Sequence, residues 1–452
     1  MAKRWSTQLV HEMKQVKTGD QRLNERCLQV IKALGSHPDQ SIPESCGDWS
    51  LTKGTYRFFE NDNITREIIL EPHQKQTEIR AENRKEILSI QDTTYLNYTS
   101  HRATDDLGPI GTLEGLQGLV VHNTLAVDPI NGDVLGLLDQ EVWAREGRHP
   151  RDESNYQRRQ RTRESERWKR GIERVEAQSL PSVIHVMDRE GDIYEVLVAL
   201  QDRRYVIRAA RNRLLTQKGR YVFDEIRRSE AMGKITVAVP SRPGQKKREA
   251  LVTLRCKQLT IRPPVALGRR GEEVMLNVLE AYEHHAPKGS TPLHWVLLTS
   301  EPIETAEQCV GVVNLYKYRW RIEEFHKSLK TGCRIEERQL KTRKKLEAVL
   351  GLFSIISVML LRLRDTSRQQ GMARDHLSPI QLCLLRERYP RLSPDPTARE
   401  AWRSVAKLGG FLARKHDGDP GWKSLWSGMH KLLDMEYAFH ITQKMLLRPQ
   451  PN

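Results

Sequence analysis

The sequence predicts a mixed α/β core with a β-rich insertion, flanked by helical segments at both ends of the chain. Three observations support this fold class. Between residues 86 and 188, a strand-like run, a hairpin, one long charged helical stretch and a further apolar run follow one another, which is typical of strands and a helix in one core. Strand-like runs then follow one another over residues 203–300. Residues 1–65 and 368–452 carry only helical patterns.

Length and charge narrow the class of protein. The chain has 452 residues, with 74 Lys and Arg against 58 Asp and Glu, which gives a formal net charge of +16. At ~150 residues per domain, this length suggests roughly three domains. The positive excess predicts a polyanionic partner. The longest apolar stretch, residues 348–361, is shorter than the ~20 residues of a membrane span. With no secretory signal at the N-terminus, we expect a cytoplasmic protein without a membrane partner.

The motifs that are missing exclude several chemistries. The 6 cysteines are scattered, and the histidines lack the spacing of zinc ligands. The chain has no P-loop, no dinucleotide-binding glycine motif and no nucleophile elbow. Any metal ion must therefore be held by oxygen ligands, and nucleotide hydrolysis, dinucleotide redox chemistry and serine hydrolysis are disfavoured.

The N-terminal segment is expected to form three helices, over residues 21–34, 50–59 and 65–83, the first capped by Asp20. Basic residues, among them Arg22 and Arg26, alternate with apolar ones. This pattern fits either a solvated helix face or a DNA-binding surface.

The core begins with a strand over residues 86–94 that contains Asp92, and a later apolar strand ends at Asp188. Between them, two strands are joined by a turn at residues 128–132 and followed by a charged helix. The elements expected after residue 94 are strands 117–127, 133–142, 182–188, 205–210, 220–226, 234–239, 250–261, 274–282 and 293–300, and helices 156–177, 306–330, 344–364, 380–388, 398–413 and 422–433.

The segment from Tyr316 to Lys330 is the most informative one. On a continuous helix at about 100° per residue, the tyrosine, Arg319, Glu323 and the lysine fall on one narrow stripe. Ile322, Phe325 and Leu329 fall on the opposite side. An ordinary amphipathic helix with i,i+4 ion pairs would show the same spacing, so the pattern alone leaves that interpretation open.

The spacing Tyr316-x₂-Arg319-x₃-Glu323-x₆-Lys330 resembles the YREK signature of bacterial insertion-sequence transposases, which are cut-and-paste DDE enzymes. Residues 89–94 (SIQDTT) resemble the family's first-aspartate strand. Residues 186–193 (VMDREGDI) resemble its second-aspartate motif, with Gly191 in place of the usual alanine. The resemblance covers nearly the whole chain and is closest to the subgroup with a β-insertion in an RNase-H-like core.

The resemblance implies that Asp92, Asp188 and Glu323 are the catalytic metal ligands. Phosphoryl transfer uses two divalent ions ~3.5–4 Å apart, and carboxylates suit Mg²⁺, with Mn²⁺ as a substitute. The resemblance further implies residues that contact DNA. At several of these positions, a role in packing or structure remains the alternative. The DNA-binding residues expected in this way are Tyr316, Arg319, Lys330, Trp295 and Arg208, and the basic pattern of the N-terminal helices adds Arg22 and Arg26. Trp295 is either a core residue or a platform for an unstacked base.

The implied organisation is an end-binding domain over residues 1–65, a catalytic domain over 66–367 with its insertion at about 203–300, and a dimerisation domain over 368–452. The implied enzyme excises its element through a hairpin intermediate and joins the 3′-OH ends to target DNA as a homodimer. An RNase-H-like nuclease without strand transfer and a non-catalytic DNA-binding regulator are the alternatives. The arginine-rich stretch 145–174 is interpreted mainly as a solvated face.

Overall fold

The computed structural model describes residues 2–111, 113–146, 164–239, 248–265 and 271–446. The chain divides into two compact units. The sheet unit comprises Thr77–Thr94 and Val121–Glu323, and the helical unit comprises Met1–Gln76, Tyr95–Val120 and Glu324–Asn452. The predicted domain boundaries at residues 65 and 367 remain predictions.

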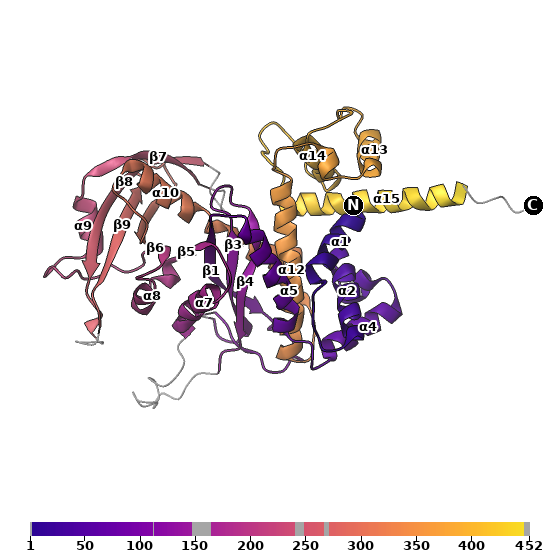
Figure 1. Cartoon of the computed structure of the whole chain (residues 1–452), viewed down its shortest axis with the longest axis horizontal. Helices are drawn as coiled ribbons and strands as arrows, with labels where there is room; N and C mark the ends of the chain where they lie inside the picture. Colours follow the sequence, from indigo (N-terminus) through magenta and orange to yellow (C-terminus); the bar gives the residue numbers. More distant parts are fainter. Residues whose placement is uncertain (1, 112, 147–163, 240–247, 266–270, 447–452) are drawn as a thin grey trace, which may run out of the picture. The chain divides into compact units, whose positions relative to one another are not determined.

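One mixed sheet organises the sheet unit (Figure 1). Its strand order is β4–β3–β1–β5–β6–β10–β9–β8–β7, and the short strand β2 (Gly108–Pro109) also pairs with β3. Strands β1, β5 and β6 run parallel, whereas each pairing from β6 through β10 to β7 is antiparallel. The order from β4 to β6, with its three parallel strands, fits an RNase-H-like core, and the remaining strands extend the same sheet. The strands are β1 (Glu86–Asn97), β3 (Gln117–Val127), β4 (Val134–Trp143), β5 (Ser182–Met187), β6 (Arg204–Arg208), β7 (Ala231–Val239), β8 (Arg248–Ile261), β9 (Val274–Tyr282) and β10 (His294–Thr299).

Helices α7 (Arg167–Glu176), α8 (Tyr194–Ala199) and α9 (Val222–Arg228) share one hydrophobic core with strands β5, β6, β8, β9 and β10. Trp168 is the largest side chain buried in this core. Helix α10 (Ala306–Lys317) contacts β6, β7 and β8. Because successive strand residues point to opposite faces, Val296 and Leu298 of β10 enter the core shared with α7–α9, while Trp295 faces the other side.

Most predicted elements of the sheet unit are confirmed, often with the predicted bounds, as for β3 and β9. The strand predicted over residues 220–226 is wrong, because helix α9 occupies most of it. Val222 and Ile226 are buried one helical turn apart, and acidic residues in the first turn and arginines in the last complement the helix dipole. The predicted helix 156–177 is observed only as α7, and residues 147–163 lie outside the described part of the chain.

The helical unit contains helices from both ends of the chain. The predicted N-terminal helices are confirmed, and Asp20 caps α2 through a bond from the Arg22 amide. Helices α13, α14 and α15 pack around a separate hydrophobic core. The bounds are α1 (Ala2–Met13), α2 (Gln21–Ser36), α3 (Ile42–Cys46), α4 (Trp49–Glu60), α5 (Arg66–Glu82, ending in the sheet unit), β2 (Gly108–Pro109), α12 (Arg343–Thr366), α13 (Pro379–Arg388), α14 (Ala398–Leu408) and α15 (Trp422–Leu446).

Helix α12 is the central element of the helical unit. Contrary to the estimate from residues 348–361, it is long and apolar enough to cross a membrane, with a mean hydropathy of 2.0 over its most apolar window. Of that window, 83% is buried inside the protein, and helices α2, α4 and α15 contact it. A buried core helix passes the same test of length and composition, so the helix is weak evidence for a membrane span.

Candidate active site

Two aspartates lie side by side on adjacent parallel strands. Strands β1 and β5 are paired up to Gln91 and Met187, and Asp92 and Asp188 are the next residue on each strand. Both side chains are half-buried. The parallel register therefore brings together the two aspartates that the sequence predicted as a pair, although 96 positions separate them in the chain (188 − 92).

Each aspartate side chain is held by a backbone amide that follows it. The Thr93 N–H donates to Oδ1 of Asp92 at 2.8 Å. The Glu190 N–H donates to Oδ1 of Asp188, also at 2.8 Å, at the start of the 3₁₀ turn η2 (Arg189–Gly191). These local bonds fix one oxygen of each carboxylate.

The helix predicted over residues 306–330 is confirmed over most of its length, but two turn residues, 318 and 319, interrupt it after α10. Helix α11 (Trp320–Lys327) follows, and a π-helical turn, η4 (Ser328–Gly332), ends the segment. At the break, the ring of Tyr318 packs against Gly132 of the β3–β4 turn, and its hydroxyl donates to the Ile130 carbonyl at 3.1 Å. A side chain at Gly132 would collide with this ring, so the glycine permits the contact that fixes the break.

The break places Arg319 between two acidic groups. Its guanidinium forms an ion pair with Glu323, four residues on, and lies 3.6 Å from Oδ2 of Asp92. The Arg319 side chain is 13% exposed. Tyr316, Arg319 and Glu323 lie close to the aspartates, although they are divided between α10, the interruption and α11. The apolar face is as predicted, with Ile322, Phe325 and Leu329 all buried.

Electrostatics couples the three predicted metal ligands. Burial, and next the negative charge of Asp188, raise the pKa of Asp92 to about 7, and Glu323 adds to this rise. Arg319 opposes the shift. The negative charges of Asp92, Asp188 and Glu323 outnumber the positive charge of Arg319 beside them. The site therefore favours a cation.

The residue types fit a divalent metal ion, since every available ligand atom is a carboxylate oxygen. Among the residues that the structure describes, however, no group of three or more His, Cys, Asp or Glu side chains is arranged to hold a metal ion. Glu323 instead pairs with Arg319. The assignment of Asp92, Asp188 and Glu323 as a metal-binding triad accordingly stays a prediction.

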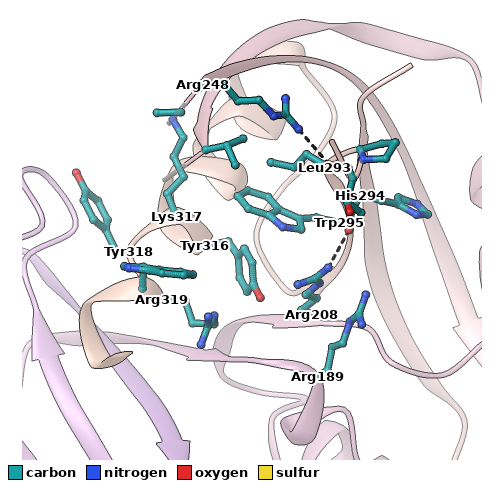
Figure 2. Close-up of a pocket in the computed structure, with 15 residues that line it drawn as sticks. Arg189, Arg208, Arg248, Leu293, His294, Trp295, Tyr316, Lys317, Tyr318 and Arg319 are labelled. Atoms are coloured by element: carbon teal, nitrogen blue, oxygen red, sulfur yellow. Dashed lines mark hydrogen bonds between the residues drawn. The ribbon is translucent and has the colours of Figure 1, made fainter. Parts of the chain in front are cut away.

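A pocket of about 710 Å³ in the sheet unit contains several of the predicted DNA-binding residues. Figure 2 shows Trp295, Tyr316 and Arg208 close together at its centre. The Trp295 ring meets the Tyr316 ring edge-on, with centroids 5.1 Å apart. Arg208 donates to the His294 carbonyl at 3.0 Å. Trp295 is therefore a half-buried pocket residue in contact with another aromatic side chain, which fits both of its predicted roles.

Tyr316 connects the pocket to the acidic site. Tyr316 is 3% exposed, and burial raises the pKa of its hydroxyl. The positive charges of Arg319 and Arg208 nearby lower this pKa and offset part of the rise. The charge of Asp188 also acts on it. Burial lowers the pKa of Arg208, which the Tyr316 hydroxyl partly offsets. Pocket and carboxylates thus form one electrostatic neighbourhood.

The remaining predicted DNA-binding residues lie in the helical unit. Lys330 donates to the Tyr95 carbonyl at 2.6 Å, and burial lowers the pKa of its ammonium group. Arg22 is exposed and pairs with Asp20. Arg22 and Arg26 line a surface pocket between α2 and α4 that also contains Lys53 and Arg57. The two N-terminal arginines therefore contribute to one basic surface formed by two helices.

The sequence analysis missed two arginines near the aspartates. Arg189 is exposed and lines the pocket, directly after Asp188. Arg167 is only 8% exposed, so its interpretation as part of a solvated face is wrong. Arg170 and Arg174 likewise form ion pairs with Glu141 of β4. Arg189 lies inside the recognised motif and could have been singled out, whereas no spacing pattern marks Arg167.

The fold and the two aspartates that follow the last paired residues of β1 and β5 are typical of an enzyme that acts on nucleic acid. Comparison with known families agrees: residues 4–64 match the model described as "Transposase DNA-binding", and residues 146–359 match "Transposase DDE domain". The second match includes Asp188 and Glu323 but not Asp92. Together the matches support a DDE transposase with a transposase DNA-binding domain, an enzyme that acts on DNA and whose domain type generally uses divalent metal ions.

Among solved structures, the chain is similar to one described as "Cryo-EM structure of piggyBac transposase synaptic complex with hairpin DNA". The alignment covers 80% of this chain and 72% of that chain, at 10% sequence identity. The TM-score is 0.36, which is too low to establish a shared fold.

Proposed function

We propose that this chain is a transposase of the YREK subgroup of bacterial insertion sequences. In this proposal it binds the inverted-repeat ends of its element, excises the element and joins the 3′-OH ends to target DNA. The observation that carries the proposal is the register of β1 and β5, which brings Asp92 and Asp188 together inside an electrostatic neighbourhood shared with Glu323. The two matched family models support the function of a DNA-binding transposase.

The proposed reaction consists of in-line phosphoryl transfers. Water first displaces a 3′-oxygen at the end of the element, and the freed 3′-OH then attacks the opposite strand to form a hairpin. Water reopens the hairpin, and the 3′-OH finally attacks a phosphodiester of target DNA. Each step exchanges one P–O bond for another, so no covalent bond between protein and DNA forms.

Asp92, Asp188 and Glu323 would hold two divalent ions, Mg²⁺ or Mn²⁺, which would supply Lewis-acid activation of the attacking and leaving oxygens. Glu323 would take part after releasing Arg319. The freed guanidinium offers a planar fork to a DNA phosphate, and Lys330 offers a point charge. Tyr316 would hydrogen-bond a phosphate.

The remaining parts of the proposal concern DNA recognition and assembly. Arg22 and Arg26 would contact the transposon end from the basic surface of α2 and α4. Trp295 would stack on a base that leaves the duplex at the hairpin, with Arg208 beside it. Helices of residues 368–452 would pair two copies of the chain, so that a homodimer holds two ends. The protein would act in the bacterial cytoplasm, associated with the nucleoid.

The decisive experiment compares cleavage and binding for Asp92→Asn, Asp188→Asn and Glu323→Gln. We expect each variant to lose Mg²⁺-dependent nicking of the cognate end while end binding stays within a few-fold, since amides keep the side-chain shape without the charge that binds a cation. Asp202→Asn, an exposed acid of the same unit, is the control. Normal nicking by any of the three variants would remove that residue from the site.

The same assay separates the alternatives. If wild-type protein nicks DNA but never joins a 3′-OH to a second duplex, the chain is a nuclease without strand transfer. If it binds the end specifically and does not nick with Mg²⁺ or Mn²⁺, it is a DNA-binding regulator.

A further inference from the structure

One arginine contacts both of the segments that hold the aspartates. Nε of Arg167 donates to the Thr93 hydroxyl at 2.9 Å, and Nη2 donates to Oε2 of Glu190 at 2.8 Å. Nη1 donates to the Glu164 carbonyl at 2.8 Å. Each nitrogen of the guanidinium therefore has a partner, as expected for a cation that is only 8% exposed.

The two side chains that Arg167 holds belong to the residues whose amides hold the aspartates. Thr93 donates its backbone N–H to Asp92, and Glu190 donates its backbone N–H to Asp188. A single guanidinium thus ties together the two backbone segments that orient the two carboxylates. The planar, rigid fork of arginine suits this double contact, which a lysine ammonium on a flexible stem cannot reproduce.

The contact at Thr93 continues into the sheet. Since the Thr93 hydroxyl accepts from Arg167, its own proton is free to donate to Nδ1 of His122, 2.9 Å away. Nε2 of His122 then donates to Oε1 of Gln91 at 3.1 Å. Gln91 and Thr93 flank Asp92 on strand β1, so hydrogen bonds fix the strand on both sides of the carboxylate.

Packing makes this network rigid. The Arg167 guanidinium lies 5.5 Å from the centroid of the fully buried Trp168 ring, and the His122 ring meets the same ring edge-on at 4.7 Å. A Cβ at Gly171 would lie 2.7 Å from Oε1 of Gln91, so α7 approaches strand β1 closely at this glycine, and a larger residue would displace the Gln91 side chain. Helix α7 therefore anchors the network to the core.

We infer that Arg167 is a positioning residue, which acts through Thr93 and Glu190 to hold the Asp92 and Asp188 carboxylates in the arrangement that binds divalent metal. This inference rests on the proposed function of the two aspartates as metal ligands. Groups that orient metal ligands in this way typically contribute 10–100-fold in metal affinity or activity.

The test measures Mn²⁺ binding to the full-length protein without DNA, by electron paramagnetic resonance of free Mn²⁺, together with the melting temperature in EDTA. We expect Thr93→Val and Arg167→Lys to weaken Mn²⁺ binding by roughly 10–100-fold. Thr93→Ser keeps the hydroxyl and should bind Mn²⁺ within about threefold of wild type. Arg170→Lys, which alters an arginine–carboxylate pair on the same helix away from the aspartates, is the matched control.

Asp92→Asn separates failure of this inference from failure of the proposed function. If wild type does not bind Mn²⁺, or Asp92→Asn binds it equally well, the proposed metal site itself is wrong. If Asp92→Asn loses Mn²⁺ while Thr93→Val and Arg167→Lys keep wild-type affinity, Arg167 has no positioning role. One more result would overturn the inference. In it, Thr93→Ser binds Mn²⁺ as weakly as Thr93→Val, and the loss of Mn²⁺ affinity only follows a lower melting temperature in EDTA.

Discussion

Replacing Asp92 by asparagine should stabilise the metal-free protein while it removes catalysis. The pKa of Asp92 is raised from 3.8 to about 7 in the folded state, because the carboxylate is buried next to Asp188. Ionisation of this group therefore opposes folding, in contrast to an ordinary salt-bridged carboxylate. The opposition is absent below about pH 4, grows as pH rises through the unfolded pKa and levels off above the folded pKa of about 7.

The magnitude follows from the two pKa values. At 1.36 kcal/mol per pKa unit, the raised pKa of Asp92 lowers the free energy of unfolding by up to about 4 kcal/mol at pH 8. At pH 5, where the carboxyl is ionised in the unfolded chain but protonated in the folded protein, it lowers that free energy by about 2 kcal/mol. Asparagine does not ionise and avoids this cost at both pH values. For a unit of this size, ~1 kcal/mol corresponds to ~2–4 °C, so the melting temperature should rise by roughly 8–16 °C at pH 8 and by about half as much at pH 5.

The assay is thermal unfolding in EDTA at both pH values for wild type, Asp92→Asn and the exposed control Asp202→Asn. Added Mn²⁺ should raise the melting temperature of the wild type and reduce its difference from Asp92→Asn, since a ligand that binds only the folded state stabilises it. A variant that is no more stable than wild type at pH 8, or equally stabilised at both pH values, would refute the raised pKa of Asp92.

Three further outcomes are expected. Trp295→Ala should slow hairpin formation while first-strand nicking stays near normal; if Trp295 only fills the core, the cavity costs ~3–5 kcal/mol and both steps fall together with the melting temperature. Affinity for the transposon end should fall steeply with salt, by ~0.9 in log K per unit log[salt] for each neutralised phosphate. Arg22→Ala and Arg26→Ala should each reduce the steepness of this dependence by up to ~0.9, which corresponds to one phosphate contact. Chelation with EDTA should abolish cleavage but not end binding, and excess Mg²⁺ should restore cleavage; activity that survives EDTA would exclude a metal-dependent site.

Much of the sheet could be predicted because its strands are short apolar runs between strong turns. The β3–β4 turn is an example: Gly132 adopts a left-handed conformation with φ of +76°, as the sequence Asn-Gly at residues 131–132 suggests. The strand ends at Asp92 and Asp188 were equally visible in the sequence. Their pairing, by contrast, depends on the parallel register of β1 and β5, which no local pattern records.

The interruption before α11 could not be predicted from periodicity, and a tertiary contact lies at the same point. Residues 306–330 have a helical pattern throughout, yet Tyr318 packs on the distant Gly132 and the helix ends there. Arg167 was misjudged for a similar reason. An arginine in a highly charged stretch is usually solvated, and only the folded core shows that this one is buried against Trp168 and bonded to Thr93 and Glu190.

Arg319 neutralises part of the acidic charge in the structure without a metal ion. Its guanidinium pairs with Glu323 and lies 3.6 Å from Asp92. It therefore lowers the pKa of Asp92, which burial and Asp188 raise. Under the proposed function, a divalent ion held by these carboxylates would take over this neutralisation and would leave Arg319 without its acidic partners. Because an unpaired guanidinium in a largely buried position is costly, the same event favours an anion beside it, and a DNA phosphate is the anion that the proposed reaction provides. Metal and DNA binding are thus expected to reinforce each other through this one side chain.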